Sequence, residues 1–169
     1  MVRKMKKNNL VLIGMPASGK STVGVILAKV LGKKFLDTDL VIQQRENALL
    51  CEIIRDKGVD GFLRCEEEAI LSVNEENTVI ATGGSAVYGE EAMKHLKDNG
   101  TVIYLKVEKS ELLKRLKDIK ERGVVLKDGE DFDEMFDERI ILYEKYADMI
   151  IEEGQASIEE TIAKIQEKM

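Results

Sequence analysis

Gly14-Met15-Pro16-Ala17-Ser18-Gly19-Lys20-Ser21 is the stretch that decides the fold of this chain. It fits the phosphate-binding pattern G-x-x-x-x-G-K-[ST] at every position. The apolar run 9–13 before it predicts a strand, and the helical pattern over 20–31 after it, ended by Gly32, predicts a helix. A strand, a glycine-rich loop and a helix in this order predict a P-loop, whose backbone N–H groups and helix N-terminus bind phosphate. The alternative is an ordinary glycine-rich turn, which does not require these flanking elements.

The P-loop pattern gives individual residues a role toward a nucleotide. We expect Lys20 to contact the β- and γ-phosphates of ATP, and Ser21 to coordinate Mg²⁺. ATP and Mg²⁺ are therefore the expected cofactors. The expected nucleotide contacts in and beside the loop are Gly14, Ala17, Ser18, Gly19, Lys20, Ser21 and Thr22.

Strands and helices alternate along the remainder of the chain. Further strands are predicted at 34–36, 78–81, 101–107 and 149–151, and helices at 40–44, 49–57, 61–73, 90–98, 109–117, 132–146 and from 157 onward. This alternation predicts an α/β fold with a parallel sheet and helices on both faces. The polar stretch 118–131 carries two glycines and no sustained period, so it predicts a long mobile loop, which in an enzyme often serves as a lid.

Two aspartates end the second predicted strand. Asp37 and Asp39 stand at the carboxyl edge of the sheet, where open α/β folds bind ligands, and their spacing places both side chains on one side. We expect Asp37 to serve Mg²⁺, and Asp39 to orient and deprotonate an attacking hydroxyl. In the alternative interpretation Asp39 only caps the helix that follows.

A glycine pair and three arginines complete the candidate site. Gly83 and Gly84 follow the third strand, where they permit a substrate or phosphate to approach the backbone, although such a pair also forms ordinary turns. Arg115 and Arg122 flank the start of the predicted lid, and Arg139 lies on the helix after it. Each arginine taken alone is typical of a solvated surface charge, but a phosphate-transferring site needs cations placed in this way.

Composition limits the function classes. The chain has 169 residues, enough for a single domain over 1–169, in which we expect residues 1–8 to be a disordered start. Its net charge of -6, with acidic and basic residues interleaved, disfavours nucleic acid as a partner. Its two cysteines and single histidine offer neither a disulfide framework nor a zinc site. Without a membrane-length apolar run, we expect a cytoplasmic monomer whose partner is a small-molecule substrate.

With the P-loop, Asp37-Thr38-Asp39 and Thr82-Gly83-Gly84, the sequence resembles the shikimate kinase family from about Leu10 to the C-terminus. The resemblance implies a five-stranded parallel sheet in the order 2-3-1-4-5, with a lid that closes over ATP. It also implies the transfer of the γ-phosphate of ATP to a hydroxyl of a small metabolite, shikimate in that family.

The resemblance assigns further roles residue by residue. It makes Asp39 the catalytic base and a ligand of the substrate hydroxyls, with Gly83 and Gly84 beside the substrate. It implies that Arg122 contacts the phosphates and that Arg115 lies beside the adenine. It also implies that Arg139 binds the substrate carboxylate.

Three positions depart from the family pattern, all of them in the acceptor pocket. Leu63 occupies the place of a second carboxylate-binding arginine, and Arg64 beside it points elsewhere because one helical residue turns a side chain by about 100°. Val59 replaces a glutamate, and Ser85 replaces a glycine. The acceptor could therefore be a different hydroxylated metabolite. A non-catalytic nucleotide-binding module is disfavoured, because the lysine, the candidate base and the lid arginine are all present.

Overall fold

A computed structural model describes residues 8–116 and 124–169 of the chain. The predicted disordered start lies almost entirely outside the described residues, and so do Arg122 and the first part of the predicted lid. The strands are β1 (Asn9–Ile13), β2 (Lys34–Asp37), β3 (Thr78–Ala81), β4 (Gly100–Val107) and β5 (Met149–Glu153). The helices are α1 (Lys20–Leu31), α2 (Thr38–Glu46), α3 (Leu50–Leu71), the 3₁₀ turn η1 (Ala86–Tyr88), α4 (Glu90–Asn99), α5 (Lys109–Arg115), α6 (Phe132–Tyr146) and α7 (Ile158–Lys168).

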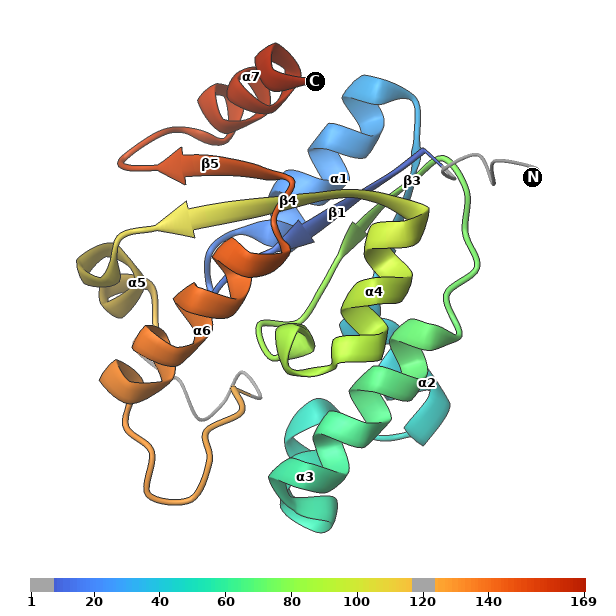
Figure 1. Ribbon diagram of the computed structural model, residues 1–169, viewed down its shortest axis with the longest axis vertical. Helices are drawn as coiled ribbons and strands as arrows, with labels where there is room; N and C mark the ends of the chain where they lie inside the picture. The colour runs from blue at the N-terminus through green and yellow to red at the C-terminus, as the bar shows by residue number, and fades with distance from the viewer. Residues whose placement is uncertain (1–7, 117–123) are drawn as a thin grey trace.

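The five strands form one parallel sheet in the order β2-β3-β1-β4-β5, which confirms the fold that the sequence and its family resemblance predict (Figure 1). β1 is central and pairs with β3 on one side and β4 on the other, for example Leu12 with Ala81 and with Ile103. All five strands therefore end at the same edge, where the loops that follow β1, β2 and β3 meet.

Helices cover both faces of the sheet. Successive β1 side chains point to opposite sides, so alternate residues of this strand pack against different helices. Val11 and Ile13 pack in a cluster with residues of α3, α4 and α6, while Leu10 and Leu12 pack with residues of α1 and α7. A third cluster joins α2 and α3 and includes Val125. Among the described residues no helix has the length and apolar composition of a membrane span.

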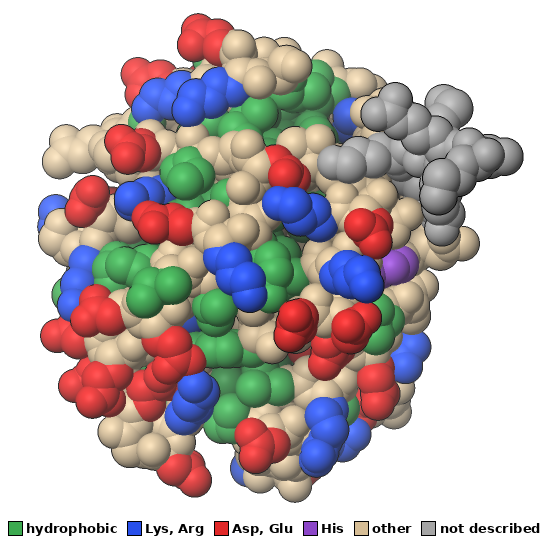
Figure 2. Space-filling model, in the orientation of Figure 1, with side chains coloured by type: hydrophobic (Ala, Val, Ile, Leu, Met, Phe, Trp, Pro, Cys, Tyr) green, Lys and Arg blue, Asp and Glu red, His purple; other side chains and the backbone are tan. Residues whose placement is uncertain are grey.

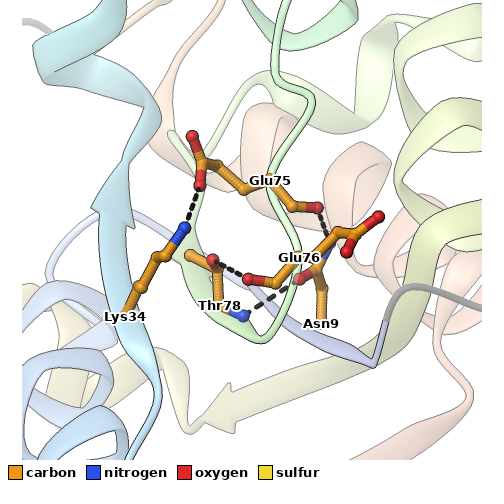
Figure 3. Close-up of polar contacts among 5 residues, drawn as sticks. All are labelled: Asn9, Lys34, Glu75, Glu76 and Thr78. Carbon is orange, nitrogen blue, oxygen red and sulfur yellow. Dashed lines mark hydrogen bonds and ion pairs between the residues drawn. The ribbon is translucent and has the colours of Figure 1, made fainter.

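Side-chain hydrogen bonds fix the other end of the sheet, where the strands begin. Asn9 Nδ2 donates to the Glu75 carbonyl at 2.8 Å, and Asn9 Oδ1 accepts from the Thr78 backbone N–H at 3.0 Å (Figure 3). A Lys34–Glu75 ion pair of 3.2 Å lies beside them. These bonds hold the first residues of β1, β2 and β3 in register. The carboxyl ends of the same strands are therefore aligned as well.

The helix boundaries follow from local chemistry. Asp37 caps α2 by accepting from the Asp39 backbone N–H at 3.0 Å, so this helix begins at Thr38, earlier than predicted. The helices predicted at 49–57 and 61–73 appear as one run broken at Gly58, whose φ of 71° is non-helical. A capping box of Ser157 and Glu160 opens α7, where the sequence predicts a helix from 157 onward.

Candidate active site

The P-loop turns between β1 and α1 at the carboxyl edge of the sheet. Gly14 and Gly19 have φ values of 150° and 88°, and even Ala17 adopts a positive φ of 63°. The loop therefore has the strained backbone that a phosphate cradle requires. Ser18 is fully buried and its backbone N–H donates to the Met15 carbonyl at 3.1 Å, which closes the turn.

Lys20 lies across the inside of this loop. Its Nζ donates to the carbonyls of Gly14 and Met15, at 2.8 Å each, and to Ser18 Oγ at 3.3 Å. Burial lowers the pKa of this amine to about 8, against the opposing effect of nearby aspartates. The ammonium is thus held inside the loop by these carbonyls, and it remains mostly protonated at neutral pH.

Gly14 admits no larger residue at this turn. A Cβ there would lie 2.7 Å from the Leu105 carbonyl oxygen, on a backbone whose φ already disfavours side chains. We expect Gly14→Ala to lower the free energy of unfolding by about 1–3 kcal/mol, from backbone strain and the close contact. Urea unfolding measures this change.

The matched control is Gly154→Ala, because a Cβ at Gly154 would meet no atom within 4 Å and its φ is not in the positive region. This control should stay within about 0.5 kcal/mol of the wild type. Equal stability of both variants would contradict the close packing of the loop against β4.

The two aspartates after β2 take different positions. Asp37 Oδ2 accepts a hydrogen bond of 2.6 Å from Ser21 Oγ, while Oδ1 caps α2. Asp39 lines the adjoining cavity, so the alternative in which Asp39 serves as the helix cap is wrong. Burial and the nearby Asp37 raise the pKa of Asp39 to about 6.

The Ser21–Asp37 pair fits a magnesium ion by its chemistry. A hydroxyl and a carboxylate oxygen within 2.6 Å of each other, next to the P-loop, are the hard oxygen ligands that Mg²⁺ takes together with nucleotide phosphates. No group of three or more acidic, histidine or cysteine side chains forms a metal site within residues 8–116 and 124–169. A magnesium ion here would accordingly draw most of its ligands from phosphate and water.

A cavity of about 270 Å³ opens between the P-loop, α2, α3 and the loop after β3. The predicted site residues that line it are Ala17, Gly19, Lys20, Ser21, Thr22, Asp39, Gly83, Gly84 and Arg139. Gly14 and Ser18 shape the loop without lining the cavity. Arg115 lies against the loop instead, where its Nη1 donates to the Ala17 carbonyl at 3.3 Å.

Arg139 reaches this cavity from α6 although its side chain is 1% exposed. Its Nη2 donates to the Val125 carbonyl at 2.5 Å, and its Nε donates to Tyr88 Oη at 3.3 Å. The interpretation of Arg139 as a solvated surface charge is therefore wrong. A buried cation in a polar cavity is suited to bind an anionic substrate group.

The glycine pair after β3 is closely packed against neighbouring side chains. A Cβ on Gly84 would lie 2.7 Å from Pro16 Cδ, and one on Gly83 would lie within 3 Å of carboxylate oxygens of Glu66 and Asp39. Tyr143 Oη donates to the Gly84 carbonyl at 2.6 Å, which fixes this loop to α6. The glycine pair is thus part of the cavity wall and not an ordinary exposed turn.

Sequence reasoning missed several residues of the cavity wall. Phe62 lines the cavity from α3, and Glu66, which also lines it, lies one helical turn beyond. The spacing of these two residues was the available signal, since positions i and i+4 share a helix face. The other missed lining residues are Pro16, Leu50, Thr82, Val124 and Val125.

The structure also locates Ser85 and Leu63, two of the three positions that depart from the family pattern. Ser85 lines the cavity, but its Oγ donates to Glu66 Oε1 at 2.7 Å. Leu63 packs against the cluster that joins α2 and α3, and Arg64 is exposed on the outer side of α3. Arg64 therefore does not replace the missing arginine in this structure.

Comparison with known proteins agrees with this arrangement. A family model described as shikimate kinase matches residues 16–169. Shikimate kinase of Aquifex aeolicus (strain VF5) is 36% identical over 155 residues, which cover 91% of each chain. Shikimate kinase 2 of Yersinia pseudotuberculosis serotype O:3 (strain YPIII) is 42% identical over 105 residues, 62% of this chain and 60% of its own.

Solved structures give the same result. Shikimate kinase from Acinetobacter baumannii, in complex with shikimate, superposes with a TM-score of 0.83 at 29% identity. The superposition covers 95% of this chain and 92% of that one.

Proposed function

Because this chain belongs to the shikimate kinase family, we propose that it transfers the γ-phosphate of ATP to a hydroxyl of shikimate. The observation that carries the proposal is the cavity in which Lys20, Asp39 and Arg139 meet at the carboxyl edge of the sheet. A cation that binds phosphate, a candidate base and an arginine that binds an anion are the groups that this reaction needs.

The residues of the cavity and the P-loop have separate roles in phosphoryl transfer. Asp39 accepts the proton of the acceptor hydroxyl, whose oxygen forms a bond to the γ-phosphorus while the bond to the β,γ-bridging oxygen breaks and ADP leaves. Lys20, which the loop carbonyls hold inside the P-loop, offsets the charge of the phosphates. Ser21 and Asp37 would hold Mg²⁺, which when bound neutralises charge on the β- and γ-phosphates.

Several assignments in this reaction remain predictions. Arg122, which the family resemblance places on the phosphates, lies outside the described residues, as does part of the predicted lid over 118–131. Arg115 lies against the P-loop, and we propose that it borders the adenine. The cytoplasmic location and the monomeric state are also predictions. The charges on the face shown in Figure 2 are of both signs and interspersed, which disfavours nucleic-acid binding there.

The acceptor carboxylate is held less firmly than a pocket with two arginines would hold it. Arg139 lines the cavity, whereas Leu63 carries no charge and Arg64 is exposed. Loss of one charge-assisted hydrogen bond costs about 1.5–3 kcal/mol, or roughly 10- to 100-fold in affinity. This difference favours a second candidate function, phosphorylation of a less acidic hydroxylated metabolite.

An ADP-release assay separates these two functions. Shikimate is compared with a panel of cyclic and linear hydroxy acids, sugars and sugar acids, each supplied with MgATP. We expect shikimate-dependent ADP release with a KM raised about 10- to 100-fold above that of a family member with both arginines. A neutral acceptor with a higher kcat/KM than shikimate would support the second candidate, and no shikimate-dependent release would contradict the first.

A further inference from the structure

Arg139, the proposed partner of the acceptor carboxylate, is a buried cation whose neighbours leave its charge uncompensated. Its side chain is 1% exposed, and none of the ion pairs formed within residues 8–116 and 124–169 includes it. Neutral groups accept its hydrogen bonds: the Val125 carbonyl from Nη2 at 2.5 Å, and the Tyr88 hydroxyl from Nε at 3.3 Å. A guanidinium carries five N–H donors in one rigid plane, so the groups that bind Nε and Nη2 determine which donors face the cavity.

Tyr88 reaches Arg139 from the 3₁₀ turn η1 that follows the glycine pair. Ala86 and Val87, the other residues of η1, are each 2% exposed, and the Tyr88 backbone N–H donates to the Ser85 carbonyl at 3.0 Å. The backbone that carries the tyrosine ring is therefore fixed beside the cavity wall. Tyr88 itself does not line the cavity, so its effect on an acceptor must pass through Arg139.

The ring of Tyr88 lies beside two cations. The Arg139 Cζ atom is 5.2 Å from the ring centroid, and the Lys127 Nζ atom is 4.9 Å from it, both within the range of a cation–π contact. Lys127 also forms an ion pair of 2.5 Å with Glu138, the residue before Arg139 on α6. Tyr88 thus joins three segments that are distant in the sequence: η1, the segment with Val125 and Lys127, and α6.

The hydroxyl of Tyr88 keeps its proton at neutral pH. Burial raises its pKa, and Glu138 adds to the increase while Arg139 opposes it. A neutral hydroxyl accepts from Nε through an oxygen lone pair, but it does not neutralise the guanidinium as a carboxylate partner would. The full charge of Arg139 therefore remains for an anion in the cavity.

We propose that Tyr88 is a positioning residue for the acceptor carboxylate, because its hydroxyl and ring hold the guanidinium of Arg139 so that its remaining donors face the cavity. The inference rests on the proposed function and deepens it: it assigns selectivity for a carboxylate-bearing acceptor to a residue that does not touch the acceptor. Among the residues that the structure describes, Arg139 is the one arginine that lines the cavity. Its orientation consequently decides how well a carboxylate is bound there.

Selectivity for the carboxylate is measured by the ratio of kcat/KM for shikimate to kcat/KM for methyl shikimate, an ester that keeps the ring and hydroxyls and lacks the negative charge. Tyr88→Phe removes the group that accepts from Nε and keeps the aromatic ring. We expect it to lower the ratio by about 3- to 10-fold, through a higher KM for shikimate, with kcat and the KM for ATP near those of the wild type. Tyr88→Leu removes the ring as well and should lower the ratio at least as much.

Tyr146→Phe is the matched control. Tyr146 is a half-buried tyrosine at the C-terminal end of α6, with Lys145 Nζ 5.0 Å from its ring centroid, and it does not line the cavity. This variant should keep the wild-type ratio within about twofold, and urea unfolding reports the stability of every variant.

A double-mutant cycle tests whether Tyr88 acts through the arginine. Arg139→Lys keeps a positive charge but has no Nε–H for Tyr88 to accept. In the Arg139→Lys background, Tyr88→Phe should change the ratio by less than about twofold, because the contact that it removes is already lost.

Four results would overturn the inference. Folded Tyr88→Phe and Tyr88→Leu proteins with the wild-type ratio would show that Tyr88 does not position the arginine. An equal loss of kcat/KM for shikimate and for its methyl ester would assign Tyr88 a structural role only. A full effect of Tyr88→Phe in the Arg139→Lys background would mean that Tyr88 acts through another group. A wild type that phosphorylates neither compound would overturn the proposed function together with this inference.

Discussion

Lys20→Ala should lower kcat for phosphoryl transfer by about 10³-fold or more while leaving the protein folded. The ammonium is held inside the P-loop by the carbonyls of Gly14 and Met15, so it is positioned before any phosphate arrives. Alanine removes the only lysine that lines the cavity within the described residues. The charge that develops on the phosphates then loses its nearest fixed cation.

Single-turnover and steady-state ADP release measure this loss, and circular dichroism checks the fold. Lys29→Ala is the matched control, because Lys29 lies on the same helix with its side chain exposed. It should keep wild-type activity. A Lys20→Ala protein that turned over at the wild-type rate would contradict the assignment of the P-loop.

Asp39→Asn should reduce kcat by about 10²-fold or more, the range for loss of a general base. The amide keeps the size of the side chain but cannot take the proton of the acceptor hydroxyl. Helix α2 should be unaffected, since Asp37 and not Asp39 caps it. The KM for ATP should stay near that of the wild type.

Steady-state kinetics with varied ATP and varied acceptor separates the two effects. Asp60→Asn provides the comparison, because Asp60 is an exposed aspartate of α3 that does not line the cavity. If Asp39→Asn and Asp60→Asn had equal kcat values with a productive acceptor, Asp39 would not be the base.

The parts of the site that could be predicted are those that a short stretch of sequence encodes. The P-loop carries its own backbone geometry, so Gly14 to Ser21 indicated both the phosphate cradle and its place after a buried strand. The two aspartates after β2 and the glycine pair after β3 followed from the rule that parallel strands end at one edge. The strand order required the family resemblance, because alternation alone does not fix which strands are neighbours.

The remaining parts depend on contacts between distant segments. Val125 belongs to a stretch that reads as polar loop, yet it is 4% exposed and its carbonyl binds Arg139. Glu66 lies in a helix with several glutamates, and only its packing against Ser85 and Gly83 distinguishes it from Glu67 and Glu68. Local pattern carries no information on such pairings, which arise when the helices cover the sheet.

The central position of β1 has a consequence for how the chain acquires this structure. β1 pairs with residues 79–81 and 100–104, so its neighbours emerge from the ribosome only after a long intervening stretch of the nascent chain has been synthesised. Contacts this distant in sequence slow folding relative to helical proteins of similar size. The P-loop attached to β1 should consequently become able to bind nucleotide late in synthesis, when β4 has left the exit tunnel and can close the sheet.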